Sequence, residues 1–383
     1  MGTADAITDA GQVTPVWLTR ALKREGVLSR GKVARIRQTS FSSVTSSISR
    51  LEVRYSDSAP RDAPRRLFLK CFVPDDSAPG LVEKQLSDSG RREVEFYNVV
   101  AGHMTAMSAV PVVRCYDARY SPERRRAHIL LADVSDTHSV PPWPLPPLRA
   151  QCEQAVDALA RCHAFWWEDP RLGNGVGEVP GEAVVSALVR ELEEKFPRFV
   201  DFLGDRLPTE KRKLYERYFA SMLRRSFGLQ GLVRVSERQA ITLIHGDGNW
   251  WNFLYPRNPA AGRVYVIDWQ AWRVGVGTDD MVYLIGLNLD RERRHALETD
   301  LLKRYHGQLL EEGVDRYTWA DCWNDYRESA IRFLAVPVWQ WAVGMPAAIW
   351  WPSLNRILDT CADLHCEELL DASIANGSPG RGG

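Results

Sequence analysis

The sequence predicts an α+β fold with two unlike parts, a small β-rich N-terminal part and a larger, mainly helical C-terminal part. Three observations carry this prediction. Short segments rich in β-branched and aromatic residues fill residues 33–134, with one helical segment among them. A proline-rich stretch at residues 135–150 is typical of a junction. Amphipathic segments with a helical period then dominate residues 151–372.

The N-terminal part is expected to contain its elements in the order β-β-β-α-β-β. A short amphipathic helix at residues 14–30 precedes it, beginning at a Thr-Pro pair. The first two strands lie within residues 33–57 on either side of a turn rich in serine and threonine. The next strand, the helix and the last two strands are expected at residues 65–73, 81–104, 111–120 and 125–134.

The C-terminal part is expected to be helical apart from one inserted pair of short strands, at residues 241–256 and 263–272. The composition of the last residues, ANGSPGRGG, predicts a disordered tail. The predicted domains are therefore an N-terminal lobe, a junction, a C-terminal lobe and a tail, at residues 1–134, 135–150, 151–372 and 373–383.

Composition excludes several classes of function. Lys plus Arg equals Asp plus Glu at 49 each, so no bulk charge attracts the chain to nucleic acid or to an anionic membrane. The seven cysteines form no CxxC pair, which indicates reduced thiols in a cytoplasmic protein. Acidic residues near the N-terminus and the lack of a long apolar run there exclude a signal peptide.

One stretch resembles a membrane span in length, since residues 333–351 carry no formal charge. It contains two prolines, a glycine and a glutamine, and its tryptophans are spread along it. A spanning helix prefers aliphatic residues in the middle and tryptophan at its ends. We therefore expect buried helix and loop here, and no membrane span.

The motif HGDGNWWN carries the first sign of chemistry. An apolar strand leads into Asp247, Asn252 follows five residues later, and a second apolar strand ends at Asp268, sixteen residues after Asn252. Phosphoryl transfer needs a carboxylate to take or orient the proton of the attacking hydroxyl. It also needs a carboxylate and an amide oxygen to hold Mg²⁺ against a triphosphate. The spacing predicts Asp247 as the base, with Asn252 and Asp268 as metal ligands.

A lysine inside an apolar strand marks the expected nucleotide side. Lys70 stands within LFLKCF, where a charge is costly unless it is paired. Glu93 on the following helix is the preferred partner, in the arrangement that positions the α- and β-phosphates in kinases. Glu95 is the competitor, two positions along and on another face of the helix.

Two loops complete the predicted nucleotide site. The serine-rich turn at residues 40–47, with Ser42 and Ser43 at its centre, lies where a phosphate-covering loop is expected. Leu131 and Ala132 end the last N-terminal strand and would offer hinge backbone to a nucleobase. No GxxxxGK[ST], GxSxG or HExxH motif occurs, so the P-loop enzymes and two hydrolase classes are not indicated.

The run HGDGNWWNFLY, followed by VIDWQAWRVGVGTDDMVYLIG, resembles the aminoglycoside phosphotransferase superfamily, in particular its ecdysteroid-kinase-like and choline-kinase-like branches. The resemblance implies a bilobal protein-kinase-like fold, ATP (or GTP) with Mg²⁺, and transfer of the γ-phosphate to a hydroxyl of a small molecule. It implies Asp247 as base, Asn252 and Asp268 as metal ligands, and a structural role for Asp280. The phosphate loop departs from the family pattern because it lacks glycine.

The expected acceptor is an apolar, sugar-bearing or natural-product alcohol, because the chain has 14 tryptophans and many fall late. A nucleotide-binding scaffold without turnover, or a tailoring enzyme acting on a peptide, is the alternative function. No nucleic-acid partner is expected, and the sequence leaves the oligomeric state open. The residues predicted to contact the acceptor are Trp250, Trp269, Gln270, Trp339 and Trp341.

Overall fold

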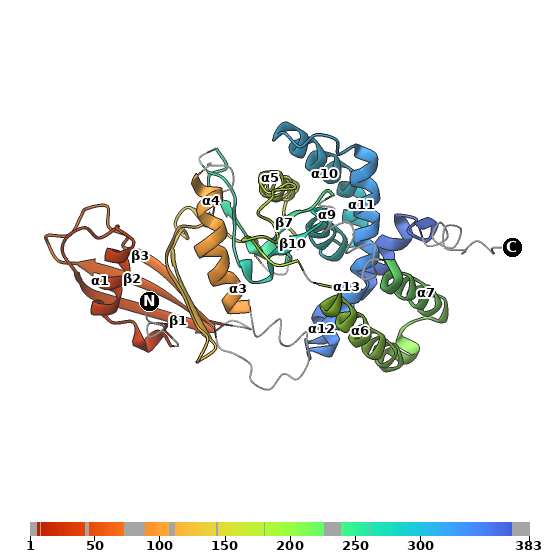
Figure 1. Cartoon of the computed structure of the whole chain (residues 1–383), viewed down its shortest axis with the longest axis horizontal. Coiled ribbons are helices and arrows are strands. Elements are labelled where there is room, and N and C mark those ends of the chain that lie inside the picture. The colour runs from red at the N-terminus through yellow and green to blue at the C-terminus, as the bar shows by residue number, and fades with distance from the viewer. Residues whose placement is uncertain are drawn as a thin grey trace. The chain divides into compact units, whose positions relative to one another are not determined.

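The computed structural model describes residues 6–7, 9–42, 46–72, 89–106, 112–142, 145–179, 181–225, 239–260 and 262–369. Ser43 and the predicted tail lie outside these ranges. The chain divides into two compact units (Figure 1). The first unit comprises residues 1–140 and 253–272, and the second comprises residues 141–252 and 273–383.

The first unit is built on a five-stranded antiparallel sheet with strand order β1-β2-β3-β5-β4. The next described elements after β3 are three helices that are continuous with one another, and the middle one, η3, is a π-helix. The predicted order β-β-β-α-β-β is therefore confirmed. The bounds are α1 (Pro15–Arg24), β1 (Val33–Ser42), β2 (Ser46–Tyr55), β3 (Arg66–Phe72), α3 (Ser89–Glu95), η3 (Phe96–Val100), α4 (Ala101–Ala106), β4 (Cys115–Ser121) and β5 (Arg126–Ala132).

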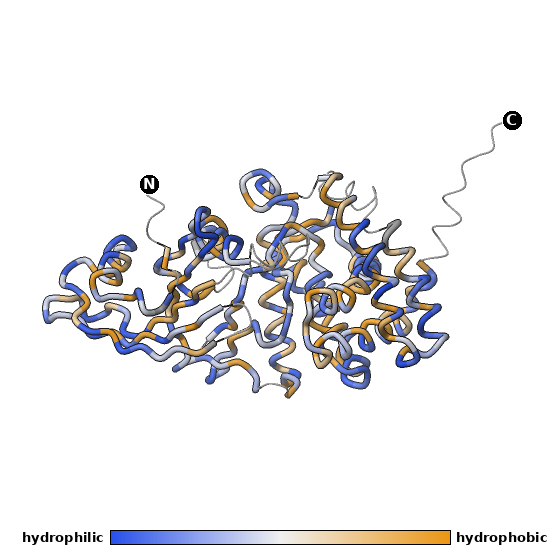
Figure 2. Tube along the Cα trace, turned by 90° about the horizontal axis from the view of Figure 1, so that it is seen from below, coloured by the Kyte–Doolittle hydropathy of each residue, from blue (hydrophilic) through white to orange (hydrophobic). Residues whose placement is uncertain are grey.

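One face of this sheet packs against helix α1. Along β2, buried residues such as Leu51 and Val53 alternate with exposed ones. The trace coloured by hydropathy shows hydrophobic and hydrophilic residues interspersed along the chain (Figure 2). Leu18 and Leu22 of α1 share a core with Leu51, Val53 and Leu69. The period of two along a strand leaves Lys70, next to Leu69, on the opposite face.

A second, three-stranded sheet in the first unit has the order β6-β8-β9. It joins β6 (His138–Ser139) to β8 (Phe253–Pro256) and β9 (Tyr265–Val266). Sequence periodicity assigned residues 253–272 to the helical part of the chain. In the structure they belong to the first unit, and the helical turn η6 (Trp269–Ala271) follows β9 there.

The second unit is mainly helical, as predicted, with one antiparallel pair of strands. The strands are β7 (Thr242–Ile244) and β10 (Arg273–Gly275). The helical elements are α5 (Arg149–Phe165), α6 (Glu182–Leu203), η4 (Gly204–Arg206), α7 (Thr209–Arg225), η5 (Trp250–Asn252), α9 (Thr278–Met281), the π-helix η7 (Val282–Leu287), α10 (Arg291–Glu311), α11 (Trp319–Arg332), α12 (Ala335–Ala342) and α13 (Ala347–Asp363).

The uncharged stretch at residues 333–351 forms two helices separated by a turn. Helix α12 ends before Gly344, whose φ of 75° suits glycine, and Pro346 precedes the first residue of α13. No helix in the described ranges combines the length and apolar character needed to cross a membrane. All seven cysteines are free, and every one except the half-buried Cys115 is buried.

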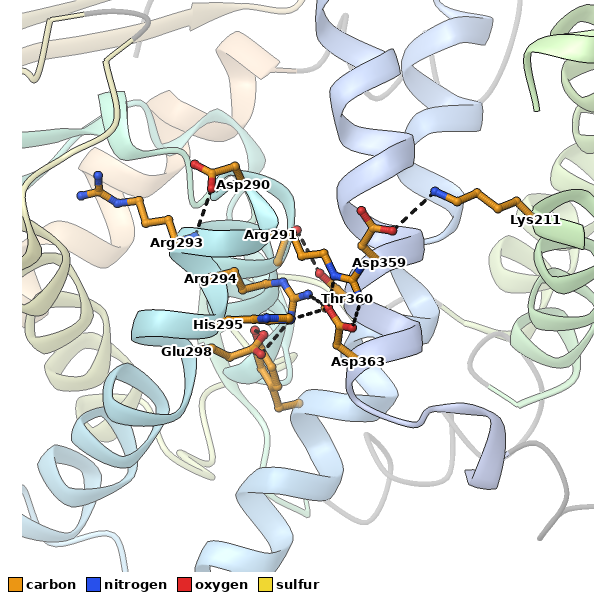
Figure 3. A network of polar contacts seen from close by, with 12 residues as sticks. Lys211, Asp290, Arg291, Arg293, Arg294, His295, Glu298, Asp359, Thr360 and Asp363 are labelled. Carbon is orange, nitrogen blue, oxygen red and sulfur yellow. Dashed lines mark hydrogen bonds and ion pairs between the residues drawn. The ribbon is translucent and has the colours of Figure 1, made fainter. Parts of the chain in front are cut away.

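A network of charged side chains ties α10 to α13 (Figure 3). Arg291, Arg294 and His295 of α10 all point toward Asp363 at the end of α13. Arg294 is 1% exposed and also pairs with Glu298 at 2.8 Å. Because a buried guanidinium is unstable without carboxylate partners, Asp363 fixes where these two helices meet.

We predict that the Asp363→Asn protein loses less free energy of unfolding than the wild type when the pH falls from 7 to 3. Burial alone would raise the pKa of Asp363, but Arg291, His295 and Arg294 outweigh it and hold that pKa below its ordinary value. The carboxylate therefore stabilises the fold above the ordinary aspartate pKa of about 3.9, and this contribution is lost as the pH falls below it. Urea unfolding at pH 7 and pH 3 measures the difference.

The matched control for this prediction is Asp359→Asn, on the same helix. Asp359 lies 3.5 Å from Lys211, a longer separation than the 2.7 Å between Asp363 and His295. It is expected to lose stability between pH 7 and pH 3 as the wild type does. An Asp363→Asn protein that loses as much stability on acidification as the wild type would contradict the role given to Asp363.

Candidate active site

Lys70 is the centre of a buried ion-pair cluster in the first unit. Its Nζ lies 2.7 Å from Oε2 of Glu93 and 2.5 Å from Oδ1 of Asp268. Lys70 is 8% exposed and Glu93 1%. The competitor Glu95 instead lies 3.5 Å from Arg91 on the same helix. The structure thus answers the question that the sequence left open, because the face of α3 that meets β3 carries Glu93.

The cluster keeps Lys70 charged. Burial alone lowers the pKa of the Lys70 ammonium, but the carboxylates of Asp268 and Glu93 outweigh burial and raise that pKa above its ordinary value. An ammonium has three N–H donors, and two of them serve these carboxylates. One donor remains for a further anionic group.

Asp268 occupies an unusual backbone position between β9 and η6. Its φ and ψ of 65° and 56° lie in the left-handed region, which aspartate enters more readily than most residues. The following residue, Trp269, is fully buried and stacks on Phe96 at 4.0 Å with an interplanar angle of 8°. Its indole N–H donates to the carbonyl of Val266 at 3.0 Å. These contacts fix the turn that presents Asp268.

In the second unit, a buried carboxylate holds the backbone of the HGD motif. Asp280 accepts hydrogen bonds from the N–H of His245 at 2.7 Å and of Gly246 at 2.8 Å. It also contacts Nε2 of His163 at 3.1 Å, and His163 Nδ1 lies 3.0 Å from the Tyr305 hydroxyl. Burial alone would raise the pKa of Asp280, but the His163 bond and the backbone donor outweigh it and lower that pKa.

Asp247 is oriented by hydrogen bonds from its own loop. Asn252 donates its Nδ2 to the Asp247 carbonyl at 2.9 Å and to the Asp247 carboxylate Oδ2 at 3.1 Å. Tyr283 on η7 also hydrogen-bonds the Asp247 carboxylate, and burial followed by the Asp247 charge raises the pKa of Tyr283 well above its ordinary value. A Cβ at Gly248 would lie 2.9 Å from the Asp280 carbonyl oxygen, so this close approach requires glycine.

The predicted hinge residues lie beside the Lys70 cluster in the sheet. Leu131 is buried and pairs with Phe68, two positions from Lys70 on the same face. The N–H of Ala132 donates to the carbonyl of Arg114 at 2.8 Å, so it is already used within the sheet. Ser42 ends β1, opposite Ser47.

The residues predicted to contact the acceptor fall into two groups. Trp250 and Trp269 are fully buried, so they contribute to the core and present no surface to a ligand. Trp339 and Trp341 on α12 and Gln270 on η6 are partly exposed. Trp341 packs 5.5 Å from Phe202, a ring that is 44% exposed. Helices α6 and α12 of the second unit therefore both contribute partly exposed aromatic rings.

Asn252 in the second unit and Asp268 in the first unit each retain an oxygen of the kind that magnesium prefers. Asn252 uses only its Nδ2 in hydrogen bonds, so its Oδ1 retains both lone pairs. Asp268 has a second carboxylate oxygen besides the one that Lys70 contacts. Within the described ranges, no group of three or more His, Cys, Asp or Glu side chains could hold a metal ion. Magnesium tolerates such a sparse set because phosphate and water complete its octahedron.

Two residues of the second unit that contact the HGD motif or its support escaped the sequence predictions: His163 and Tyr283. His163 contacts Asp280 across 117 positions, a separation that no local pattern reveals. Tyr283 follows Asp280 by three positions on one helical segment, and that spacing was an available signal.

The comparisons with known proteins agree on family and fold. The profile of the ecdysteroid kinase-like family matches residues 42–315. A search of curated proteins found no match. A protein from Ralstonia eutropha JMP134 assigned as an aminoglycoside phosphotransferase is 16% identical, with a TM-score of 0.53 over 91% of this chain and 96% of that chain. A choline kinase from Cryptosporidium parvum Iowa II is 12% identical, with a TM-score of 0.53 over 89% of this chain and 91% of that chain.

At these identities the two solved structures are evidence for the fold alone. The family match is broader evidence, because it covers more than half of the 383 residues. It includes both the Lys70 cluster and the HGD motif. The chain therefore belongs to the ecdysteroid kinase-like family and has the protein-kinase-like fold of small-molecule kinases.

Proposed function

We propose that the protein transfers the γ-phosphate of ATP to a hydroxyl group of a small molecule in a magnesium-dependent reaction. The observation that carries this proposal is the buried Lys70, held by Glu93 from α3 and by Asp268 after β9. A lysine in this setting keeps its charge and one N–H donor for phosphate. Asp247 in the HGD motif of the second unit supplies the carboxylate that accepts the proton of the acceptor hydroxyl.

The nucleotide end of the reaction is assigned to the first unit. Lys70 binds oxygens of the α- and β-phosphates, and Glu93 fixes the direction of its ammonium group. Magnesium, when bound, neutralises charge on the phosphates, and its protein ligands are Asp268 and Asn252. Ser42, at the end of β1, is assigned to the phosphates together with the serine-rich turn that follows, of which Ser43 lies outside the described residues. GTP is the alternative to ATP, since phosphate contacts do not distinguish the two bases.

The acceptor end of the reaction is assigned to Asp247. Its carboxylate accepts the proton of the acceptor hydroxyl while that oxygen forms a bond to the γ-phosphorus and the bond to the leaving ADP oxygen breaks. Asn252 and Tyr283 keep the carboxylate in one orientation. Positioning of this kind is the main contribution a protein makes to phosphoryl transfer.

The acceptor is assigned to the apolar or sugar-bearing alcohols. Trp341 and Phe202 offer aromatic surface in the second unit, with Trp339 nearby on α12. Such rings stack on apolar bodies and on sugar faces. A screen of hydroxylated natural products by mass spectrometry tests this class, because a retained phosphoryl group adds about 80 Da.

We predict that Asp247→Asn removes most turnover while nucleotide binding and folding stay intact. The amide has the shape of the carboxylate but cannot accept the proton, and loss of a general base costs roughly 10²–10⁴-fold in kcat. The readout is ADP release with an accepted hydroxyl compound. The control is Asp201→Asn, whose side chain is 84% exposed. Near-wild-type kcat in Asp247→Asn would refute the assignment of the base.

We predict that Asp268→Ala abolishes the magnesium-dependent part of nucleotide binding. The change removes a metal ligand and one of the two carboxylates that hold Lys70. Ligand binding to the native state raises Tm with the logarithm of ligand concentration, so thermal shift with ATP and Mg²⁺, or with ATP and chelator, measures the effect. Asp136→Ala, with a side chain 70% exposed, is the control. An unchanged magnesium-dependent shift in Asp268→Ala would remove this residue as a ligand.

A further inference from the structure

A series of buried hydrogen bonds connects helix α10 to the HGD motif of the second unit. The Tyr305 hydroxyl of α10 lies 3.0 Å from Nδ1 of His163 on α5, and Nε2 of His163 lies 3.1 Å from Oδ2 of Asp280. Asp280 in turn accepts the backbone N–H groups of His245 and Gly246. Tyr305, His163 and Asp280 are all fully buried, so these bonds are shielded from bulk water.

The donors around Asp280 determine which nitrogen of His163 carries a hydrogen. Two backbone N–H groups point to this side chain at 2.7 Å and 2.8 Å. Burial alone would raise the pKa of Asp280, but its His163 and backbone donors outweigh burial and lower it, so the group is a carboxylate. Because a carboxylate can only accept hydrogen bonds, the contact with His163 requires the hydrogen to be on Nε2.

Tyr305 supplies the donor on the other side of the imidazole ring. Burial first, and then Cys322 and Asp280, raise the pKa of Tyr305 well above its ordinary value, so the hydroxyl keeps its proton. Among the described residues, its hydrogen-bond partner is Nδ1 of His163. If both nitrogens of His163 were protonated, the buried O–H of Tyr305 would have no acceptor there. Only the neutral ring, with its hydrogen on Nε2, satisfies every donor in the series.

The backbone packs closely around the His163–Tyr305 bond. Gly277 directly precedes α9, the short helix that carries Asp280. A Cβ at Gly277 would overlap the Tyr305 hydroxyl and would lie 2.8 Å from Nδ1 of His163, so this close approach requires glycine. The carbonyl of His163 accepts a 2.7 Å hydrogen bond from Thr242 of β7, the strand that leads into the HGD motif. The bond is therefore held between α9 and the segments that support the motif.

We propose that Tyr305 is a positioning residue for phosphoryl transfer. Its hydroxyl holds His163 as the neutral Nε2–H tautomer, which keeps Asp280 and the HGD turn in the orientation that presents Asp247. This inference rests on the function proposed above. Removing the hydroxyl frees the ring to tilt or to change its protonation, and the backbone of the motif then loses a fixed partner at the other end of the series.

The first test determines the protonation of His163 by NMR on protein labelled with ¹⁵N-histidine, without nucleotide. The chain has eight histidines, and the signals of His163 are those absent from the His163→Gln protein. At pH 7 the wild type should show hydrogen on Nε2 and none on Nδ1. In Tyr305→Phe the Nδ1 signal should move, because that nitrogen has lost its donor. A doubly protonated His163 in the wild type, or a hydrogen on Nδ1 alone, would overturn the proposal.

The second test measures the magnesium-dependent release of ADP from ATP, with water as the acceptor. Tyr305→Phe should lower kcat about 10-fold, because a small misplacement of a catalytic group is costly. Binding of ATP in the presence of chelator, measured by thermal shift, should not change, because Lys70 and Glu93 belong to the first unit. Near-wild-type kcat in Tyr305→Phe would contradict the positioning role.

The matched control is Tyr326→Phe. Tyr326 is fully buried, and its hydroxyl donates to Glu298 of α10 at 2.8 Å, a bond outside the series that reaches the HGD motif. Both variants should lower Tm, but only Tyr305→Phe should lower kcat. Equal losses of kcat in the two variants would show that Tyr305 acts through stability alone. If the wild type releases no ADP, the proposed function fails and the catalytic role of Tyr305 fails with it, while the nitrogen signals still report on the hydrogen-bond series.

Discussion

A positive charge buried in a β-sheet constrains the whole first unit. Lys70 sits in β3 with little solvent, where an ammonium without carboxylates is unstable. One carboxylate is Glu93 of α3, and the other is Asp268, which lies 198 positions after Lys70 in the chain. Removing one partner of such a pair typically costs about 3–5 kcal/mol. The same two bonds that make the charge tolerable also fix its direction, and the proposed binding of phosphate by Lys70 depends on that arrangement.

The second unit also contains a buried charge that needs partners, but here the charge is negative. Asp280 is a buried carboxylate, and its partners are the backbone N–H groups of His245 and Gly246 together with the ring of His163. Because those backbone groups belong to the HGD motif, satisfying Asp280 fixes the turn that carries Asp247. The π-helix η7 follows Asp280 directly and brings Tyr283 to the Asp247 carboxylate.

Local patterns in the sequence were sufficient for the fold class and for the main candidates. The spacing of Asp247, Asn252 and Asp268 is visible in one short stretch, and Lys70 stands out because its strand is apolar. Long-range packing was not visible. The choice of Glu93 over Glu95, the burial of Trp250 and Trp269, and the contact of His163 with Asp280 depend on which faces meet. The grouping of residues 253–272 with the first unit depends on long-range contacts, among them the pairing of β8 with β6, the stacking of Trp269 on Phe96 and the Lys70–Asp268 ion pair.

The most direct measurement is manganese electron paramagnetic resonance on the wild-type protein, with Mn²⁺ in place of Mg²⁺. The described residues offer too few ligands to hold a metal by themselves, so Mn²⁺ should stay free when added alone. It should become bound at one equivalent or more when the imido analogue of ATP is added, with Asp268 and Asn252 as its protein ligands. Tight binding without nucleotide, or no binding with it, would contradict the assignment of these residues to a nucleotide-borne metal.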